Sequence, residues 1–286
     1  MNIFLNKFLK LLILIVINVL LVSCSSTQLI YSIADKFIQD EVEYFLDLNE
    51  KERVILNQEI SEIVIWHRKS MLPKYSNYLV DISNKLEIGD YDTSNINKAV
   101  RNARFLIEET VTGLTPFASQ ILMRHRNVEA VKFIEKKMEM RRQERLEELS
   151  QPKDMLYKER LERLLSSFER FMSSLNEEQV KLLEAHASAT LLDNSIRLKN
   201  RTMRQKVFIE FLKTQPDEEE LTAYLNKLLL RGYEITNPTY QDFLEASLER
   251  FEFLLGDMLA VSTELQKKKI VKKLRSYSED FKTVSR

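Results

Sequence analysis

Glycine and proline are scarce in this chain, which has 4 glycines and 5 prolines among 286 residues. Ordinary proteins contain about 7% glycine and about 5% proline. Antiparallel sheets need glycine in their tight hairpin turns, and this chain has almost none for that purpose. The composition therefore predicts an all-α fold.

Apolar residues recur at helical spacing along most of the chain. In residues 157–175 they follow alternating steps of four and three, as in a coiled-coil seam. We expect about ten antiparallel amphipathic helices in an elongated helical bundle, with a long charged helical hairpin around residues 115–175. The expected helices cover 28–47, 49–70, 73–89, 94–112, 115–149, 152–175, 176–213, 216–231, a segment from 237, and a last one from 262 or 263; Gly113 separates the fourth from the fifth.

Short similar blocks indicate where some of these helices begin. Asn49 precedes Glu52 by three residues and Asn176 precedes Gln179 by three, which is the spacing of a capping box. The blocks 48–52 and 175–179 look alike, and 261–265 resembles them faintly. An internal repeat and repeated use of one capping solution both explain the likeness, and we favour the second.

The first 23 residues have the pattern of a secretory signal peptide. Lys7 and Lys10 precede an apolar run from Leu11 to Val22. The sequence Leu-Val-Ser-Cys at 21–24 resembles a bacterial lipobox, and Cys24 is the only cysteine in the chain. An uncleaved membrane span and a plain signal peptide cleaved elsewhere are the alternatives, and we favour the lipoprotein.

The lipobox resemblance carries further implications for Cys24. It implies that this residue becomes the first of the mature protein and bears acyl chains such as palmitate, which anchor a protein firmly when more than one is attached. Ser25 takes the place where an aspartate often signals inner-membrane retention. The expected location is the outer membrane of a Gram-negative bacterium, on the face toward the periplasm.

Length and charge limit the other options. Residues 24–286 are expected to form a single all-helical periplasmic domain, with a division into sub-bundles 28–149 and 152–286 left open. Basic and acidic side chains balance, at 43 each. This balance gives no electrostatic case for nucleic-acid binding.

The sequence contains no recognisable catalytic, metal-binding or cofactor-binding motif. The histidines are His67, His125 and His186, one in each of three expected helices, without the His-Glu-x-x-His spacing of a zinc site. No Gly-x-Ser-x-Gly motif and no glycine-rich phosphate loop occur. We therefore expect no catalytic residue, no metal site and no cofactor.

The segment Trp66-His67-Arg68 has two interpretations. On a helix from Asn49, His67 falls on an apolar stripe, so it should face inward and need a hydrogen-bonding partner from another helix. Alternatively, the three side chains line a ligand groove in which Trp66 stacks and Arg68 holds an anion. We favour the structural interpretation. The other stripe residues are Leu56, Ile60, Ile63, Val64 and Met71.

Two charged segments also have a structural and a functional interpretation. Residues 135–163 mix acids and bases, which is typical of exposed helices and would also suit a partner-binding arm. Residues 266–275 contain six basic side chains. This second segment would suit contact with anionic lipid or glycan, although one solvated helix face is the more common role.

Several blocks together resemble a known family. They are the lipobox, WHRKSMLPKY at 66–75, LNEEQ at 175–179 and STELQKKKIVKKLRSYSEDF at 262–281. They are similar to helical lipoproteins of proteobacteria that are known only as a domain of unknown function, across essentially the whole mature chain. That family usually has Leu-Thr-Pro-Glu-Gln where this chain has 261–265, a looser match. The resemblance implies an address and a fold, and no activity.

These observations favour a lipid-anchored periplasmic protein without enzymatic activity. Its expected partners are the membrane, through the lipid on Cys24, and an unidentified envelope protein or glycan. A periplasmic stress chaperone or client-binding module is the alternative, because LNEEQ also resembles a sequence motif of small helical stress chaperones. An enzyme whose site is built from non-local residues is the third class.

Overall fold

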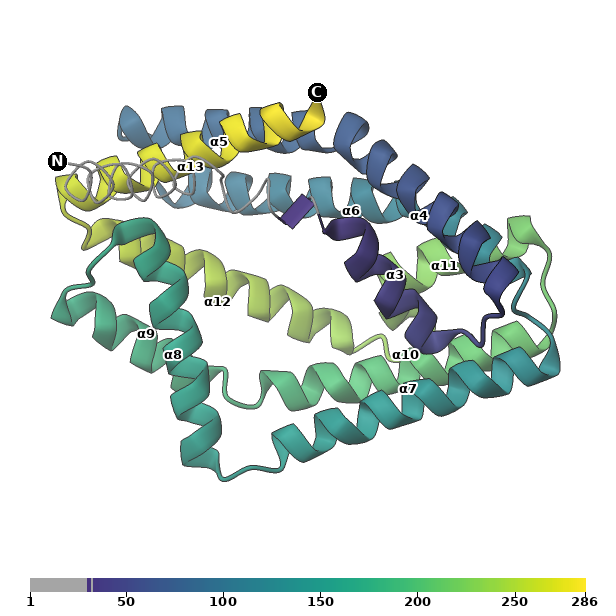
Figure 1. Ribbon diagram of the computed structural model, residues 1–286. Coiled ribbons are helices and arrows are strands. Elements are labelled where there is room, and N and C mark those ends of the chain that lie inside the picture. Colours follow the sequence, from purple (N-terminus) through teal and green to yellow (C-terminus); the bar gives the residue numbers. More distant parts are fainter. Residues whose placement is uncertain (1–29, 32) are drawn as a thin grey trace, which may run out of the picture.

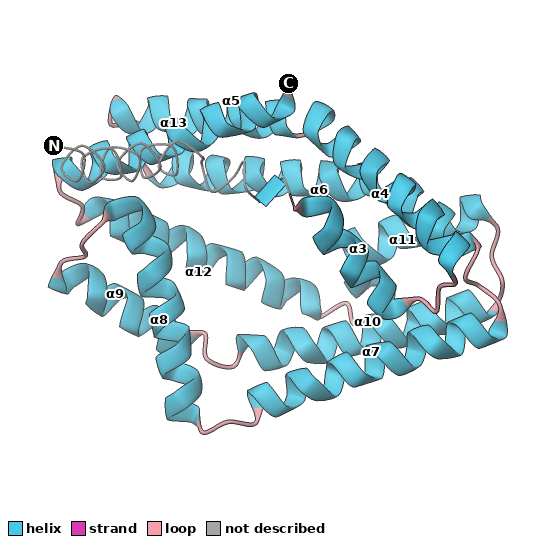
Figure 2. Cartoon of the chain, viewed as in Figure 1, coloured by secondary structure: helices cyan, strands magenta, loops and turns pink. Residues whose placement is uncertain are grey.

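The computed structural model describes residues 30–31 and 33–286, so the expectations for the signal peptide and Cys24 lie outside the described residues. The described chain is all-α, as predicted, and contains no strand (Figure 2). Its helices are α3 (Ala34–Phe45), α4 (Glu50–Ser70), α5 (Leu72–Glu87), α6 (Thr93–Met123), α7 (Val128–Leu149), α8 (Lys153–Met172), α9 (Glu177–Ala189), α10 (Asp193–Lys213), α11 (Glu218–Arg231), the short 3-10 helix η1 (Gly232–Glu234), α12 (Tyr240–Ala260) and α13 (Glu264–Ser285).

Capping boxes fix the start of four helices. Asn49 and Asn176 cap α4 and α9 with the partners predicted from their spacing, Glu52 and Gln179. Two further boxes start α11 at Asp217 and α13 at Thr263. In each box the cap side chain accepts from a backbone N–H that has no partner within the helix, so these helix starts depend on local chemistry.

One expected break does not occur. α6 runs without interruption through Gly113 and Pro116, although a proline inside a helix removes a backbone hydrogen bond and costs about 3 kcal/mol. Thr115 and Ser119 of α6 are buried, and α6 packs along α11. This tertiary packing therefore outweighs the local preference for a break.

Two other expected helices are divided. The segment 115–149 ends one helix at Met123 and begins another after Asn127, whose side chain accepts from the Ala130 N–H. The segment 176–213 is divided in the same way at residues 190–192, between α9 and α10. In both places the chain changes direction at the turn, so α6 packs with α11 while α7 packs with α10, and α9 packs with α8 and α12 while α10 packs with α7.

The helices form an elongated frame (Figure 1). α5, α6 and α13 lie along one long edge, and α7 pairs with α10 along the opposite edge. α8 and α9 pack together at one end, α3 and α4 at the other, and α12 crosses between them, packing on α6 and α9.

The closest tie between distant segments joins α5 to α13. Ser76 and Ser278 are both buried, and each hydroxyl lies 3.0 Å from the backbone carbonyl of the other residue. Small side chains at this crossing let the two helices come close together. The last helix of the chain is thereby fixed to one of the first.

The packing corrects one expectation. The charged segments α7 and α8 follow each other, but they do not form a packed hairpin around 115–175, because α7 lies along α10 while α8 lies along α9 and α13. The division into sub-bundles 28–149 and 152–286 was left open by the sequence, and helices from its two sides pair as α5 with α13, α6 with α11 and α7 with α10.

Two apolar clusters hold the frame together. The larger one joins α4, α6, α7, α10 and α11, and the smaller one joins α8, α9, α12 and α13. The predicted stripe on α4 enters the larger cluster, since Leu56, Ile60 and Val64 are buried there. At the centre of the smaller cluster are Met172, Leu183, Leu254, Met258 and Ile270.

Candidate functional site

The three side chains of Trp66-His67-Arg68 contact different neighbours. The Trp66 ring lies 6.2 Å from that of Phe117 on α6, between centroids, and Arg68 Nε donates to the Val284 carbonyl of α13 at 2.9 Å. His67 is half-buried and its Nδ1 lies 2.8 Å from the Tyr31 hydroxyl. Because each group already has a partner in the fold, these contacts favour the structural interpretation.

Burial keeps both members of the Tyr31–His67 hydrogen bond uncharged. Burial, reinforced by Tyr75, raises the pKa of Tyr31 to about 12, and burial lowers the pKa of His67 below its usual value. Both groups are therefore uncharged at neutral pH. Either the Tyr31 hydroxyl or a protonated His67 Nδ1 is the donor, according to the tautomer of the neutral imidazole.

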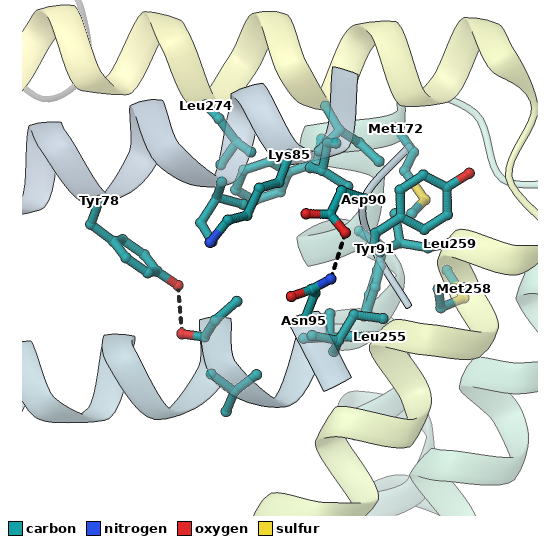
Figure 3. Close-up of a pocket in the computed structure, with 18 residues that line it drawn as sticks. Tyr78, Lys85, Asp90, Tyr91, Asn95, Met172, Leu255, Met258, Leu259 and Leu274 are labelled. Atoms are coloured by element: carbon teal, nitrogen blue, oxygen red, sulfur yellow. Dashed lines mark hydrogen bonds between the residues drawn. The ribbon is translucent and has the colours of Figure 1, made fainter. Parts of the chain in front are cut away.

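An apolar cavity of about 250 Å³ lies between α5, α6, α8, α12 and α13 (Figure 3). Its walls contain aliphatic, aromatic and methionine side chains from all five helices. Those from α8 are Phe168, Phe171 and Met172, and the two phenylalanines belong to the seam predicted at 157–175. Among the other lining residues are Ile82, Leu86, Ile96, Val100, Leu255, Met258, Leu259, Ile270 and Leu274.

The α5–α6 turn forms one end of this cavity. Gly89 adopts φ +79°, a left-handed conformation that glycine takes without strain. The Gly89 N–H reaches the Leu86 carbonyl and the Asp90 N–H reaches the Lys85 carbonyl, at 3.3 and 2.8 Å, which is the Schellman ending of a helix. The turn brings Asp90, Tyr91 and Asn95 to the cavity (Figure 3).

Four of the polar side chains that line the cavity, Tyr78, Lys85, Asp90 and Asn95, are hydrogen-bonded within the protein. The Tyr78 hydroxyl donates to the Ala99 carbonyl at 3.1 Å, and Asn95 Nδ2 donates to Asp90 at 2.5 Å (Figure 3). Lys85 Nζ lies 2.8 Å from Asp81. Burial raises the pKa of Tyr78, with a further contribution from Asp81, so its hydroxyl remains a donor. The arrangement suits an apolar guest.

Ligands for a metal do not converge within residues 30–31 and 33–286. No group of three His, Cys, Asp or Glu side chains is placed to hold an ion in that part of the chain. His67 lies on α4, His125 in the turn after α6, and His186 on α9. Among the described helices, none has both the length and the apolar character to span a bilayer.

The cavity was not predicted from the sequence. Its lining residues come from positions between 78 and 274, and no local motif connects them. The one available signal was the apolar seam at 157–175. That seam was interpreted as a helix-pairing surface, whereas Phe168 and Phe171 form part of a cavity wall.

One comparison with known proteins gave a match. A family profile described as "Family of unknown function (DUF6279)" matches residues 44–247. No curated protein and no solved structure matches this chain.

Proposed function

We propose that this chain, which belongs to the DUF6279 family of unknown function, is a lipid-anchored protein of the cell envelope that binds an apolar ligand without catalysing a reaction. The observation that carries the proposal is the cavity between α5, α6, α8, α12 and α13. An empty apolar cavity of 150 Å³ is known to accept a small apolar guest, and this one is larger.

The polar groups beside the cavity support binding rather than catalysis. Catalysis by side chains needs an acid, base or nucleophile that reaches a substrate in a suitable protonation state. Here Tyr78 donates to a backbone carbonyl and Lys85 forms an ion pair with Asp81. These groups therefore serve the local structure of the helices.

The anchor proposal depends on Cys24. The lipobox at 21–24 and the lack of any other cysteine support acylation of this residue after removal of residues 1–23. The proposed location is the periplasmic face of the outer membrane in a Gram-negative bacterium. Mass spectrometry of the mature N-terminus should find an acylated Cys24, and membrane fractionation of a Cys24→Ser variant should find it released. An unmodified thiol, or residues 1–23 still attached, contradicts the anchor.

Ligand binding is tested by filling the cavity. Ala99 lies on its wall, so Ala99→Leu should abolish binding of an apolar fluorescent probe such as N-phenyl-1-naphthylamine while the melting temperature stays the same or rises. Ala223→Leu, at an exposed position of α11, is the matched control and should bind the probe normally. Unchanged probe binding by Ala99→Leu would exclude the cavity as the site.

A client-binding role, as in periplasmic stress chaperones, is the second candidate. It is favoured by large apolar side chains that remain exposed on several helices. Suppression of the aggregation of an unfolded client, at substoichiometric amounts of this protein, would support it. The most exposed of these side chains include Phe37, Val54, Ile88, Phe105 and Leu265.

A further inference from the structure

A second hollow adjoins the apolar cavity at the α5–α6 turn. Leu86 and Tyr91 line both spaces, so the two spaces adjoin at these side chains. The walls of the second hollow come from the turn at 87–89 and from the first half of α13. An apolar space and a polar space therefore meet at Tyr91.

The second hollow is positively charged. Four basic side chains and two acidic ones line it, and both acids are already paired. Glu87 accepts two hydrogen bonds from Arg275, at 2.6 and 3.1 Å, and Glu264 lies 3.0 Å from Lys267. Lys267 Nζ also lies over the Tyr91 ring, 5.1 Å from its centroid.

Two lysines supply the remaining charge. Lys268 and Lys272 are four residues apart on α13, so they project from one face of the helix, and both are exposed. Neither makes an ion pair within the described part of the chain. They are available to an anionic group placed beside Tyr91.

We propose that the site binds an anionic lipid with a single acyl chain, with the chain in the apolar cavity and the headgroup at Lys268 and Lys272. This inference rests on the proposed function and adds the chemical class of the ligand. The cavity follows α5 from Tyr78 to Leu86, a distance of about 12 Å at the rise of a helix, which suits an extended hydrocarbon chain.

A flat membrane surface fits the site less well than a single lipid. Juxtamembrane basic segments attract anionic bilayers through charge alone, and the basic face of α13 resembles such a segment. Here the basic residues adjoin an apolar cavity that is lined by five helices. That combination recognises one chain and one headgroup together.

The test uses the full mature chain and displacement of the apolar probe by amphiphiles below their micelle-forming concentrations. Dodecanoate should displace the probe more effectively than dodecanol, and dodecyltrimethylammonium least effectively. The preference for dodecanoate should weaken as salt is raised, because exposed charges are screened. Equal displacement by all three compounds would overturn the inference.

Charge-removing variants identify the headgroup site. Lys268→Gln/Lys272→Gln should weaken dodecanoate binding roughly three- to tenfold, as expected for two exposed charge contacts, and leave dodecanol unchanged. Lys132→Gln/Lys136→Gln, an exposed pair with the same spacing on α7, is the matched control. Equal effects of the two double variants on dodecanoate would overturn the inference.

The outcomes separate this inference from the proposed function. If Ala99→Leu abolishes binding of both dodecanol and dodecanoate while the lysine variants change neither, the cavity binds ligands and the headgroup assignment is wrong. If Ala99→Leu changes nothing, the proposed function itself fails at this site. If the chain binds anionic vesicles but no monomeric amphiphile, α13 is a membrane contact and the inference is wrong.

Discussion

The His67 side chain, near the end of α4, contacts Tyr31 and also Tyr75 at the start of α5. Its Nδ1 is hydrogen-bonded to the Tyr31 hydroxyl, and its ring lies 5.7 Å from that of Tyr75, between centroids. His67→Ala should lower the free energy of unfolding by roughly 1–3 kcal/mol, because the half-buried Tyr31 hydroxyl loses its hydrogen-bonding partner. Urea denaturation measures this loss.

A conservative variant provides the control for His67. Asn places an amide group, which can donate or accept, near the position of Nδ1, so His67→Asn should recover part of the lost stability. If His67→Ala melts like the wild type but no longer binds a partner captured from the envelope, the structural interpretation is wrong and Trp66-His67-Arg68 lines a binding groove.

Gly113 and Gly256 should respond in opposite ways to alanine. A Cβ at Gly113 would lie 2.0 Å from the Trp66 ring, whereas one at Gly256 would meet only Ile96, at 3.7 Å. Gly113→Ala should therefore destabilise the protein by about 1–3 kcal/mol through overpacking. Gly256→Ala should stabilise it by up to about 1 kcal/mol, the gain in helix propensity.

Thermal or urea denaturation of both glycine variants decides this prediction. In the double variant Gly113→Ala/Trp66→Leu the clash disappears, so the cost of the alanine should be smaller than in the wild-type background. Stabilisation by Gly113→Ala alone would show that Trp66 does not need the close approach to α6.

At the scale of helices, two capping boxes meet inside the protein. Gln179 and Gln266 each accept from the backbone N–H of their own cap residue, and their side-chain amides also donate to each other, at 2.9 and 3.2 Å. Both residues are buried. The turn between α8 and α9 is thereby joined to the turn between α12 and α13.

Removing one member of this glutamine pair should lower the free energy of unfolding more than removing the equivalent residue of an isolated capping box. Gln179→Ala or Gln266→Ala should each lower the free energy of unfolding by about 1–3 kcal/mol, since the partner amide remains buried with fewer hydrogen bonds. The double variant should cost less than the sum, because the two share one interaction. Glu220→Ala, in the exposed box of α11, is the control and should cost about 0.5–1 kcal/mol. Additive losses would mean that the amides act independently.

The meeting of these turns also bears on the similar sequence blocks. α8 packs on α13 while α9 packs on α12, so the two pairs of consecutive helices exchange equivalent contacts. Met172 and Leu183 of one pair meet Met258 and Ile270 of the other in the smaller apolar cluster. The likeness between 175–179 and 261–265 therefore corresponds to a shared packing role.

For the whole molecule, the three histidines predict how stability depends on pH. Burial is the main cause that lowers the pKa of His67, of His125 and of His186, where Arg160 and Arg250 add to the effect. Each histidine then binds protons more readily when the chain is unfolded. The contribution of the neutral histidines to the free energy of unfolding is fully present above their unfolded pKa of about 6.5. This contribution is lost as the pH falls below that value, toward the lower pKa values of the folded state.

Urea denaturation between pH 7.5 and pH 5.5 measures this dependence. Most carboxylates stay ionised in that window, so the histidines dominate the change. The unfolding midpoint should fall toward pH 5.5, and His67→Asn should reduce the slope because one titrating group is removed. A midpoint that rises toward pH 5.5 would contradict the prediction.

The sequence alone determined the fold class and several helix starts. Low glycine and proline content excluded sheets, and the caps at Asn49 and Asn176 were predicted correctly, because a cap is satisfied within three residues of itself. The stripe of Leu56, Ile60 and Val64 was also correct, since helical spacing fixes which side chains share a face.

Only the tertiary structure decided which faces meet. An amphipathic helix requires an apolar partner without specifying which one, so α7 was expected beside α8 and lies along α10 instead. The continuity of α6 through Pro116 depends on burial against α11, and the apolar cavity depends on five helices at once. These features arise from contacts between residues far apart in the chain, which local spacing cannot encode.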